Sequence, residues 1–361
     1  MRRSILLLLI NFSLLIQPLI AQTEKQVRWG EILRQPTSWY GSDEAQRIAD
    51  NVLLYQHENG GWYKNIDMAQ TLSEEEQKEI LKAKTEPSGT TIDNGATFTQ
   101  LRFLALVYDA TKEKKYQSAF LRGIDYLLAA QYENGGWPQY YPIRKGYYEH
   151  ITYNDGAMIG VMSLLWDVSE GNGPYDFVKV SIRKKAKAAV DKGLEIILDT
   201  QVVLDGELTI WCAQHYKDSL EPAKARAFEL ASLSGAESVG ILKYLMKIPD
   251  PNERVKKSIS SAVAWLEEHK IEGKRIIKVE DDRLEKGYDL QVIEDPEGRP
   301  LWARFYELNT QKPIFVGRDS QIKYDLSEIE YERRVGYSYL GNYAERVLDK
   351  DYPEWKSKWI D

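Results

Sequence analysis

The chain of 361 residues contains a single cysteine, Cys212, so no disulfide can form within it. Histidine is also scarce, and the four His residues are scattered without the spacing typical of zinc ligands. Beyond the N-terminus, no apolar run is long enough to span a bilayer. Alternating strand-like runs are rare as well. These absences argue against a disulfide-stabilised domain, a zinc centre, a later membrane span and a predominantly β fold.

Basic residues are fewer than acidic ones, with 48 Lys and Arg against 55 Asp and Glu and a formal net charge of −7. An acidic protein is a poor candidate for nonspecific nucleic-acid binding, so we expect no nucleic-acid partner. Any polyanion that it handles must meet a local basic site. Aromatic residues are plentiful, at 23 Tyr and 10 Trp, and their faces suit sugar rings and helix packing equally well.

Residues 1–21 have the pattern of a secretory signal peptide. Arg2 and Arg3 form a basic start, an apolar stretch follows, and a small residue precedes a cut expected before Gln22. A single membrane anchor is the alternative, but the apolar run is short and interrupted by polar residues. We therefore expect an exported protein without a membrane span after cleavage, in which residues 22–361 form one catalytic domain.

Apolar residues recur at steps of three and four from Asp43 to about Glu268, as in Ala45-Ile48-Ala49-Val52-Leu53. This periodicity predicts a mostly helical, all-α fold. Residues 280–300 are rich in charged and turn-forming residues and interrupt the pattern. The stretch from Tyr331 to Leu348 has the character of a last helix.

A heptad occurs twice, as QHENGGW at Gln56–Trp62 and QYENGGW at Gln131–Trp137, and a degraded copy runs from Gln201 to Trp211. The spacing is similar to the Gln–Trp repeat of triterpene cyclases, in which Gln ties helix ends together and Trp packs across the repeat. The acid motif of a cyclase, Asp-x-Asp-Asp, is absent. We therefore interpret the heptads as architectural joints. Three such units predict a toroid of helical hairpins with the long loops at one end.

Each heptad is followed by a short motif that opens the next helix, as at residues 91–96, 152–157 and 232–236. Asp93 and Asp155 stand in the first two openers, whose loops would face one cleft. Two carboxylates there can hold a hard cation such as calcium, with Asn94 or Asn154 adding oxygen ligands. They can also act as the acid and base of a glycosidase. The third alternative is that each Asp only caps a helix.

Cationic residues recur near the same loops. Lys64 follows the first heptad and Arg226 precedes the third opener, while others lie between aromatic residues in non-helical sequence, namely Arg299, Arg304 and Arg318. Arginine is well shaped for a bidentate grip on carboxylates. A basic cleft in an acidic protein would suit an anionic polymer, whereas ordinary surface charge is the alternative for any one of these residues.

Five motifs occur in order: Gly-Gly-Trp-Tyr-Lys-Asn, Thr-Ile-Asp-Asn-Gly-Ala-Thr, Tyr-Asn-Asp-Gly-Ala-Met, Ala-Arg-Ala-Phe-Glu and Trp-Ala-Arg-Phe-Tyr-Glu. Together they resemble polysaccharide lyase family 10, the toroidal pectate lyases, from about Arg47 to Asp349. The resemblance implies an (α/α)3 toroid. It also implies a secreted or periplasmic enzyme that cleaves polygalacturonate by calcium-assisted β-elimination.

The same resemblance implies a role for each matching residue. Asp93 and Asp155 correspond to calcium-linked aspartates, and Asn94 to a residue that touches substrate or metal. Arg226 corresponds to the arginine that acts as the catalytic base. Substrate carboxylates would be held by Lys64, Arg304 and Arg318.

Two other functions remain open from the residues themselves. One is an inverting glycoside hydrolase of α-toroid fold that uses Asp93 and Asp155. The other is a non-catalytic protein that binds uronides. We further expect a monomer.

Overall fold

The computed structural model describes residues 27–361. The expected signal segment at residues 1–21 therefore lies outside the described residues. Within residues 27–361, no helix combines the length and the apolar character that crossing a membrane would require.

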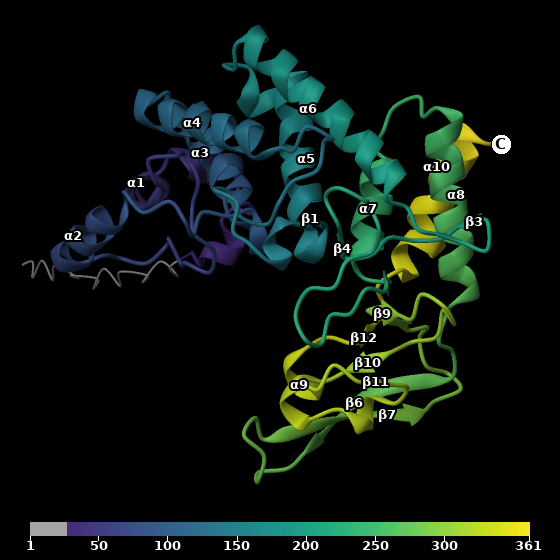
Figure 1. Cartoon of the computed structure of the whole chain (residues 1–361). Helices are drawn as coiled ribbons and strands as arrows, with labels where there is room; N and C mark the ends of the chain where they lie inside the picture. Colours follow the sequence, from purple (N-terminus) through teal and green to yellow (C-terminus); the bar gives the residue numbers. More distant parts are fainter. Residues whose placement is uncertain (1–26) are drawn as a thin grey trace, which may run out of the picture.

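The fold is mostly helical, as predicted, and its helices extend from α1 and α2 at the left of Figure 1 to α8 at the right. Their bounds are α1 Asp43–Tyr55, α2 Glu74–Ala83, α3 Phe98–Thr111, α4 Lys114–Ala130, α5 Ala157–Glu170, α6 Val180–Asp199, α7 Glu237–Leu245, α8 Glu253–Glu268, α9 Tyr331–Gly336 and α10 Tyr352–Trp359. A π-helical turn at Val347–Asp351 leads into α10.

The long helices form three hairpins, α3/α4, α5/α6 and α7/α8, which confirms the predicted arrangement of helical pairs. Helices α3, α5 and α7 lie side by side in one layer, and α1, α4, α6 and α8 lie side by side in the other. Helix α5 is apolar on nearly all sides because it lies between neighbours in both layers. Gly160 permits this, since a Cβ there would lie 2.3 Å from a ring carbon of Phe98.

Local sequence explains where these helices start. Ser42 caps α1 by accepting a hydrogen bond from the backbone N–H of Ala45, and Asn252 caps α8 in the same way through Val255. The apolar stripe of α1 is fully buried at Ala45, Ile48, Ala49 and Val52. The stripe that the sequence shows is therefore the face that packs into the core.

The repeated heptads are joints, as interpreted, because their Gln side chains link one unit to the next. Gln56 Nε2 donates to the carbonyls of Gly60 and Ala119, at 3.0 and 2.8 Å. Gln131 Nε2 donates to Gly135 and Ala189, both at 2.9 Å. Gln201, in the degraded copy, donates to Thr209 at 2.8 Å and Ser258 at 3.0 Å. Each Gln thus closes its own loop and binds the backbone of the next helix in the second layer, which is α4, α6 or α8.

The tryptophans of the joints are part of the core. Trp62, Trp137 and Trp211 are fully buried, and each indole N–H donates to a carbonyl of the preceding helix at 2.7–2.8 Å. Trp302 repeats this contact with Leu266 at 2.8 Å, which adds a fourth member that the sequence pattern did not suggest. None of these rings is available to stack on a sugar.

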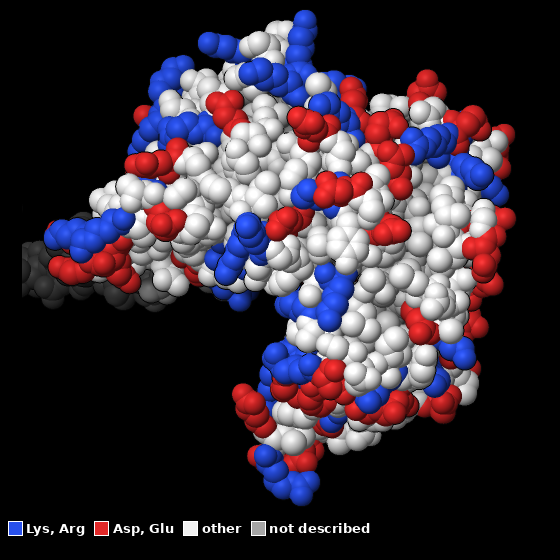
Figure 2. Space-filling model, viewed as in Figure 1, with Lys and Arg blue, Asp and Glu red and all other residues white. Residues whose placement is uncertain are grey.

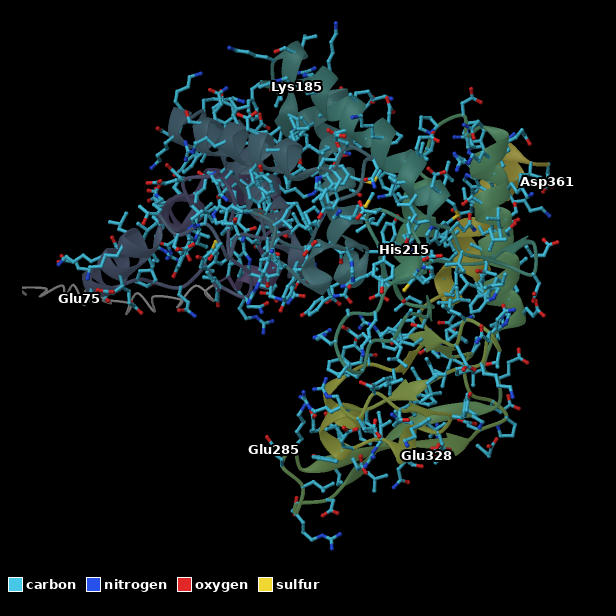
Figure 3. All side chains as sticks on the ribbon, in the orientation of Figure 1. Glu75, Lys185, His215, Glu285, Glu328 and Asp361 are labelled. Atoms are coloured by element: carbon cyan, nitrogen blue, oxygen red, sulfur yellow. The ribbon has the colours of Figure 1, made fainter. Side chains whose placement is uncertain are left out.

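Strands are short and pair two at a time in antiparallel fashion: β1 Ile151–Thr152 with β4 Gln214–His215, β2 Val203–Leu204 with β3 Glu207–Leu208, β5 Leu233–Ser234 with β9 Phe305–Tyr306, β6 Lys274–Glu280 with β7 Tyr288–Glu294, β8 Trp302–Ala303 with β12 Leu340–Gly341, and β10 Phe315–Val316 with β11 Ile322–Lys323. The turn-rich stretch at 280–300 contains the β6–β7 turn and strand β7. Glu285 lies in the turn of this hairpin, at the far end of the C-terminal lobe, the part of the molecule formed by β6 to β12 and α9 (Figures 1 and 3).

The predicted last helix from Tyr331 to Leu348 is wrong as one continuous helix, since only its two ends are helical. Helix α9 ends at Gly336, and the chain then runs extended through Tyr337 into β12. β12 pairs with β8, and beside this pair the backbone N–H of Arg304 donates to the carbonyl of Tyr339 at 2.7 Å. Residues 339–341 are therefore extended rather than helical. Tertiary pairing overrides the helical periodicity there.

Candidate active site

The joints that end in Trp62, Trp137 and Trp211 also bind the openers that precede α3, α5 and α7. The backbone N–H of Thr91 donates to the carbonyl of Trp62 at 3.0 Å, and Thr152 donates to Trp137 at 3.2 Å. In the third unit Ser234 donates to Trp211 at 2.7 Å. The buried tryptophans therefore fix the positions from which the candidate site residues project.

The first two openers carry Asp and Asn in opposite order, as Asp93-Asn94 and Asn154-Asp155. Asn94 and Asp155 share a left-handed backbone, with φ of 49° and 50°. Asp93 and Asn154 are the buried members of each pair. The two aspartates are thus not at equivalent positions, since one carboxylate is sheltered while the side chain of the other is 39% exposed.

Neither aspartate caps a helix. Helices α3 and α5 begin after Thr97 and Gly156, and neither N-cap residue makes a side-chain capping bond. The carboxylates of Asp93 and Asp155 instead face cations. The capping alternative is therefore wrong for both residues.

Asp93 is ion-paired with Lys64, whose Nζ donates to Oδ2. Burial alone would lower the pKa of Lys64, but the hydrogen bond and charge of Asp93 outweigh it and raise that pKa. The other carboxylate oxygen of Asp93 accepts the backbone N–H of Asn94 at 3.0 Å. Lys64 is consequently a fixed cation held by the first opener.

Asp155 is paired with Arg304, whose Nη2 lies 3.1 Å from Oδ1. The same nitrogen donates to Glu237, the buried first residue of α7, which also accepts from Ser234 of the third opener. Burial would lower the pKa of Arg304, yet the negative charge of Glu237 and the neighbouring groups raise it. The Arg304 Nε is buried without an acceptor among the described residues. Arg304 also stacks over the ring of Tyr337 at 4.7 Å.

Arg226 forms a fork with Glu229, in which Nε donates to Oε2 at 2.7 Å and Nη2 donates to Oε1. These hydrogen bonds raise the pKa of Arg226, in spite of partial burial. Glu229 is buried and also accepts the hydroxyl of Tyr337 at 2.8 Å. The Glu229 carboxylate therefore orients the Arg226 guanidinium and favours its protonated form.

These side chains meet in one small pocket of about 70 Å³, lined by Lys64, Asp93, Asn94, Gln139, Tyr147, Asn154, Asp155, Gln214, Arg226 and Glu229. Arg304 contacts this set through Asp155. Figure 2 shows Lys and Arg side chains at the angle between the helical layers and the C-terminal lobe. The structure thus brings together five of the predicted site residues and places Arg304 beside them.

Arg318 does not line this pocket. It lies between β10 and β11, its side chain is 62% exposed, and it pairs with Glu332, which raises its pKa. Arg299 is paired with Glu345 and is also exposed. Neither contacts the carboxylates of the openers.

Sequence reasoning missed the acids that hold the arginines. Glu229 stands in the Ala-Arg-Ala-Phe-Glu motif, three residues after Arg226, and that spacing could have suggested an ion pair. Glu237 follows the third opener, where Ser234 stands in place of an aspartate. Tyr337 gave no signal, because it lies in the segment predicted as helix.

The residue types fit a calcium ion in part. Residues 27–361 hold no cluster of three or more His, Cys, Asp or Glu side chains that could bind a metal by itself. Carboxylate and amide oxygens are nevertheless the ligands that calcium takes. Two amide oxygens that line the pocket, Gln139 Oε1 and Gln214 Oε1, are buried without a hydrogen-bond donor in the described structure. A cation would need further oxygen ligands from outside the chain.

The fold and the site define a polysaccharide lyase. Residues 56–348 match the model of the pectic acid lyase family, and the chain belongs to that family. Pectate lyases are generally calcium-dependent. No curated protein sequence matches the chain.

Two solved structures of a family 10 polysaccharide lyase from Cellvibrio cellulosa are similar to this chain. One shares 34% identity, covers 91% of this chain and 94% of its own, and superposes with a TM-score of 0.75. The other is an aspartate-to-alanine mutant in complex with trigalacturonic acid, at 33% identity, 93% and 100% coverage and a TM-score of 0.76. The resemblance seen in the five motifs is confirmed.

Proposed function

We propose that this pectate lyase is exported and cleaves polygalacturonate by calcium-assisted β-elimination, with Arg226 as the base. The observation that carries the proposal is the meeting of Asp93, Asp155, Lys64 and Arg226 in one pocket. A related structure that holds trigalacturonic acid supports the choice of polymer.

The reaction has to remove a weakly acidic proton. A base takes the proton from C5 of a galacturonate unit, the C5–H electrons form a C4–C5 double bond, and the C4–O4 bond breaks. The departing O4 takes up a proton. Negative charge develops next to a carboxylate that already carries one, so cationic groups that bind this carboxylate lower the barrier. Bound calcium would supply further positive charge at the same carboxylate.

Asp93 and Asp155 would hold the calcium, with Asn94 or the neighbouring amides as further oxygen ligands. Two carboxylates are few for this ion, so we expect uronate carboxylates of the substrate to complete the ligand set. Lys64 and Arg304 are paired with these same aspartates. If the aspartates held a metal, both cations would be able to hold substrate carboxylates. We also assign Arg318, which lies outside this pocket, to a substrate carboxylate farther along the polymer.

Arg226 must lose a proton before it can accept one. Its ordinary pKa lies above about 12, and the fork with Glu229 raises it further. Turnover should therefore increase with pH over the alkaline range, and cations bound nearby would favour the neutral guanidine. Glu229 engages Nε and Nη2, which leaves Nη1 without a hydrogen-bond partner in the described structure. That nitrogen is the one that we assign to the C5 proton.

The glycoside hydrolase alternative has no support in the site. A general acid must be protonated, whereas Asp93 and Asp155 are each bound to a cation. Membership of a lyase family also argues against a non-catalytic uronide-binding protein.

The organisation of the chain belongs to the same proposal. We infer that residues 1–21 direct export and that residues 22–361 act as one catalytic domain and as a monomer. Buried residues from Ile32 to Trp355 belong to one hydrophobic cluster, which supports a single domain.

Incubation with polygalacturonate at alkaline pH, with calcium or with EDTA, tests the function directly. A lyase produces an unsaturated uronide that absorbs in the ultraviolet, and we expect this product with calcium and its loss with EDTA. Cleavage to saturated products would contradict the proposal.

A further inference from the structure

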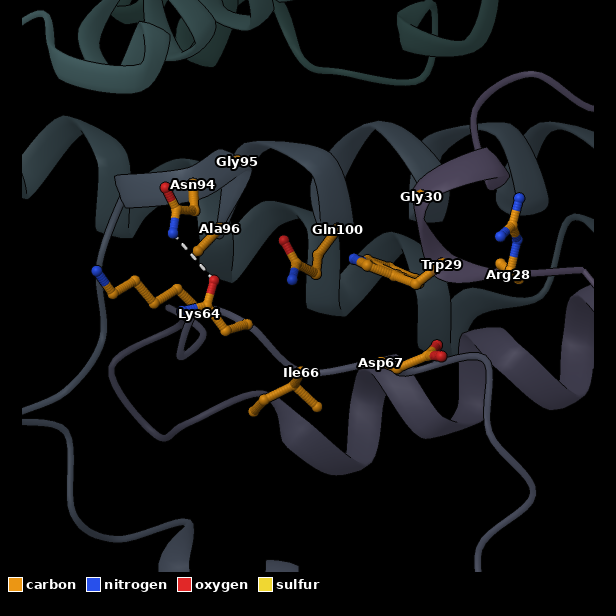
Figure 4. Close-up of a pocket in the computed structure, with 11 residues that line it drawn as sticks. Arg28, Trp29, Gly30, Lys64, Ile66, Asp67, Asn94, Gly95, Ala96 and Gln100 are labelled. Carbon is orange, nitrogen blue, oxygen red and sulfur yellow. Dashed lines mark hydrogen bonds between the residues drawn. The ribbon is translucent and has the colours of Figure 1, made fainter. Parts of the chain in front are cut away.

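A second and larger pocket adjoins the candidate active site. Its volume is about 340 Å³, within the range of small-ligand sites. Three segments meet there: the turn at Trp29–Glu31, the loop after Trp62, and the start of α3 (Figure 4). The side chains that matter for its chemistry are Arg28, Trp29, Lys64, Asp67, Asn94 and Gln100.

Lys64 and Asn94 line both pockets, so the two spaces share a wall. Asn94 Nδ2 donates to Asn65 Oδ1 at 3.0 Å, which braces this wall. The dashed line at Asn94 in Figure 4 marks this bond. Asn65 and Asn94 both have a left-handed backbone, with φ of 62° and 49°. A polymer held by Lys64 in the active site can therefore continue into the larger pocket.

Gln100 is a polar group that the fold does not satisfy. It lies in the first turn of α3 and is 3% exposed, and its Oε1 has no donor among the described residues. Its Nε2 has only a weak contact with the sulfur of Met68, at 3.8 Å. A buried, unsatisfied amide costs stability, and an apolar side chain would pack there more favourably. Its place in the lining of a pocket indicates that it serves a ligand.

The other lining groups specify the kind of ligand. Trp29 packs edge-on against Phe103, with the ring centroids 6.0 Å apart, and offers an aromatic surface that suits a sugar ring. Among residues 27–361, Arg28 donates to Glu31 through Nη2, and no bond of its Nε or Nη1 is found there, so these two nitrogens are suited to a carboxylate. Lys64 brings a second cation, and the one acid, Asp67, already accepts the backbone N–H of Ala69.

We propose that this pocket is a distal subsite that binds a uronate unit of the polymer beyond the unit being cleaved. Trp29 contacts the sugar ring, Gln100 Oε1 accepts a hydrogen bond from a sugar hydroxyl, and Arg28 binds the carboxylate. The inference rests on the proposed function, since the occupant is taken to be polygalacturonate. It predicts that longer oligomers bind better than short ones because of these three side chains.

The first test compares oligogalacturonides of increasing length on the full-length mature enzyme. W29A and R28A should raise KM for long oligomers by about tenfold, equivalent to about 1.4 kcal/mol, and should change cleavage of the shortest substrates much less. R283A is the matched control, because Arg283 is likewise an exposed arginine paired with a near neighbour, Asp281, and lies in the β6–β7 turn. Equal loss on short and long oligomers would contradict the subsite.

Two further variants separate binding from folding. Gly30 lines the pocket, has no neighbouring atom within 4 Å of an added Cβ, and shows no strained backbone. G30Y should therefore block the pocket without disturbing the fold, and should raise KM for long oligomers. Q100M should keep or raise the melting temperature while weakening the binding of long oligomers. If Gln100 had only a structural role, Q100M would instead lower the melting temperature together with the binding.

The outcomes distinguish the two proposals. An enzyme that releases no unsaturated uronide from any substrate would refute the proposed function. An active enzyme whose preference for long oligomers survives in W29A, R28A and G30Y would refute the subsite alone. Loss of that preference, with unchanged melting temperatures, supports it.

Discussion

Replacing Arg226 with lysine keeps a positive charge at this position but removes the guanidinium fork. Arg226 Nε lies 2.7 Å from Glu229 Oε2, and Nη2 contacts the other oxygen. A lysine amine reaches at most one of these oxygens and cannot be held in a fixed plane. The substitution therefore changes both the position of the base and the pH at which it becomes neutral.

The magnitude follows from these two effects. A positioned general base contributes about 10²–10⁴ in rate, so we expect turnover to fall by at least about 100-fold in R226K and further in R226A. The Arg226 side chain is 41% exposed, so screening limits the loss of the ion pair to about 1 kcal/mol of stability. Binding of oligogalacturonide should persist in both variants.

The pH profile identifies the base. Lysine has an ordinary pKa of about 10.4, while arginine stays protonated to above about 12. Residual activity of R226K should level off near pH 10 to 11 (about the lysine pKa), whereas wild-type activity keeps rising as far as the enzyme stays folded. The assay is ultraviolet absorbance of the unsaturated product, at saturating oligogalacturonide.

The control is R283K, since Arg283 makes the same fork with Asp281, at 2.8 Å for both nitrogens, in the exposed β6–β7 turn. It should leave rate and profile unchanged. A near-normal rate in R226K, or a profile identical to that of the wild type, would show that Arg226 is not the base.

Three other predictions concern metal, joints and acid stability. D93N should abolish the rise in melting temperature that calcium and oligogalacturonide together produce in the wild type, measured by calorimetry; an unchanged rise would remove Asp93 from the metal site. Q201M removes the side-chain donor that binds two buried carbonyls, so the free energy of unfolding should fall by about 2 kcal/mol, whereas the exposed Q321M should not change it. Burial lowers the pKa of His215 from 6.5 to about 4, so the unfolded chain binds the proton more readily and about 3 kcal/mol of stability should be lost as the pH falls between these values. In H215Q, the free energy of unfolding from urea titrations should fall less steeply as the pH falls. An equally steep fall would contradict this assignment.

Much of the fold was accessible from the sequence because the helices are amphipathic and the joints repeat. The periodicity of α1 marks its buried face, and the Gln–Trp spacing marks where each hairpin meets the next. The exception is the segment after Gly336. Its apolar spacing suits a helix, but Tyr337 is needed beside Glu229, and the backbone pairs with β8 instead.

The candidate site was accessible only as a set of residue types. Asp93 and Asp155 stand out because two openers are alike, and the pocket does bring them together with Lys64 and Arg226. The partners of the cations could not be predicted in the same way. Glu237 meets Arg304 across 67 positions of the chain, and no local pattern encodes that distance.

The sequence by itself determined the helical repeats, the places where loops must gather, and the family, because these depend on local periodicity and on short motifs in a set order. Only the tertiary structure decided which charges face one another. It showed that each aspartate is bound to a cation rather than capping a helix, that Glu229 pairs with Arg226, and that the buried Gln100 Oε1 has no donor within residues 27–361. The physical reason is that ion pairing and desolvation depend on spatial distances between residues far apart in the chain. The spacing of residues along the sequence does not give these distances.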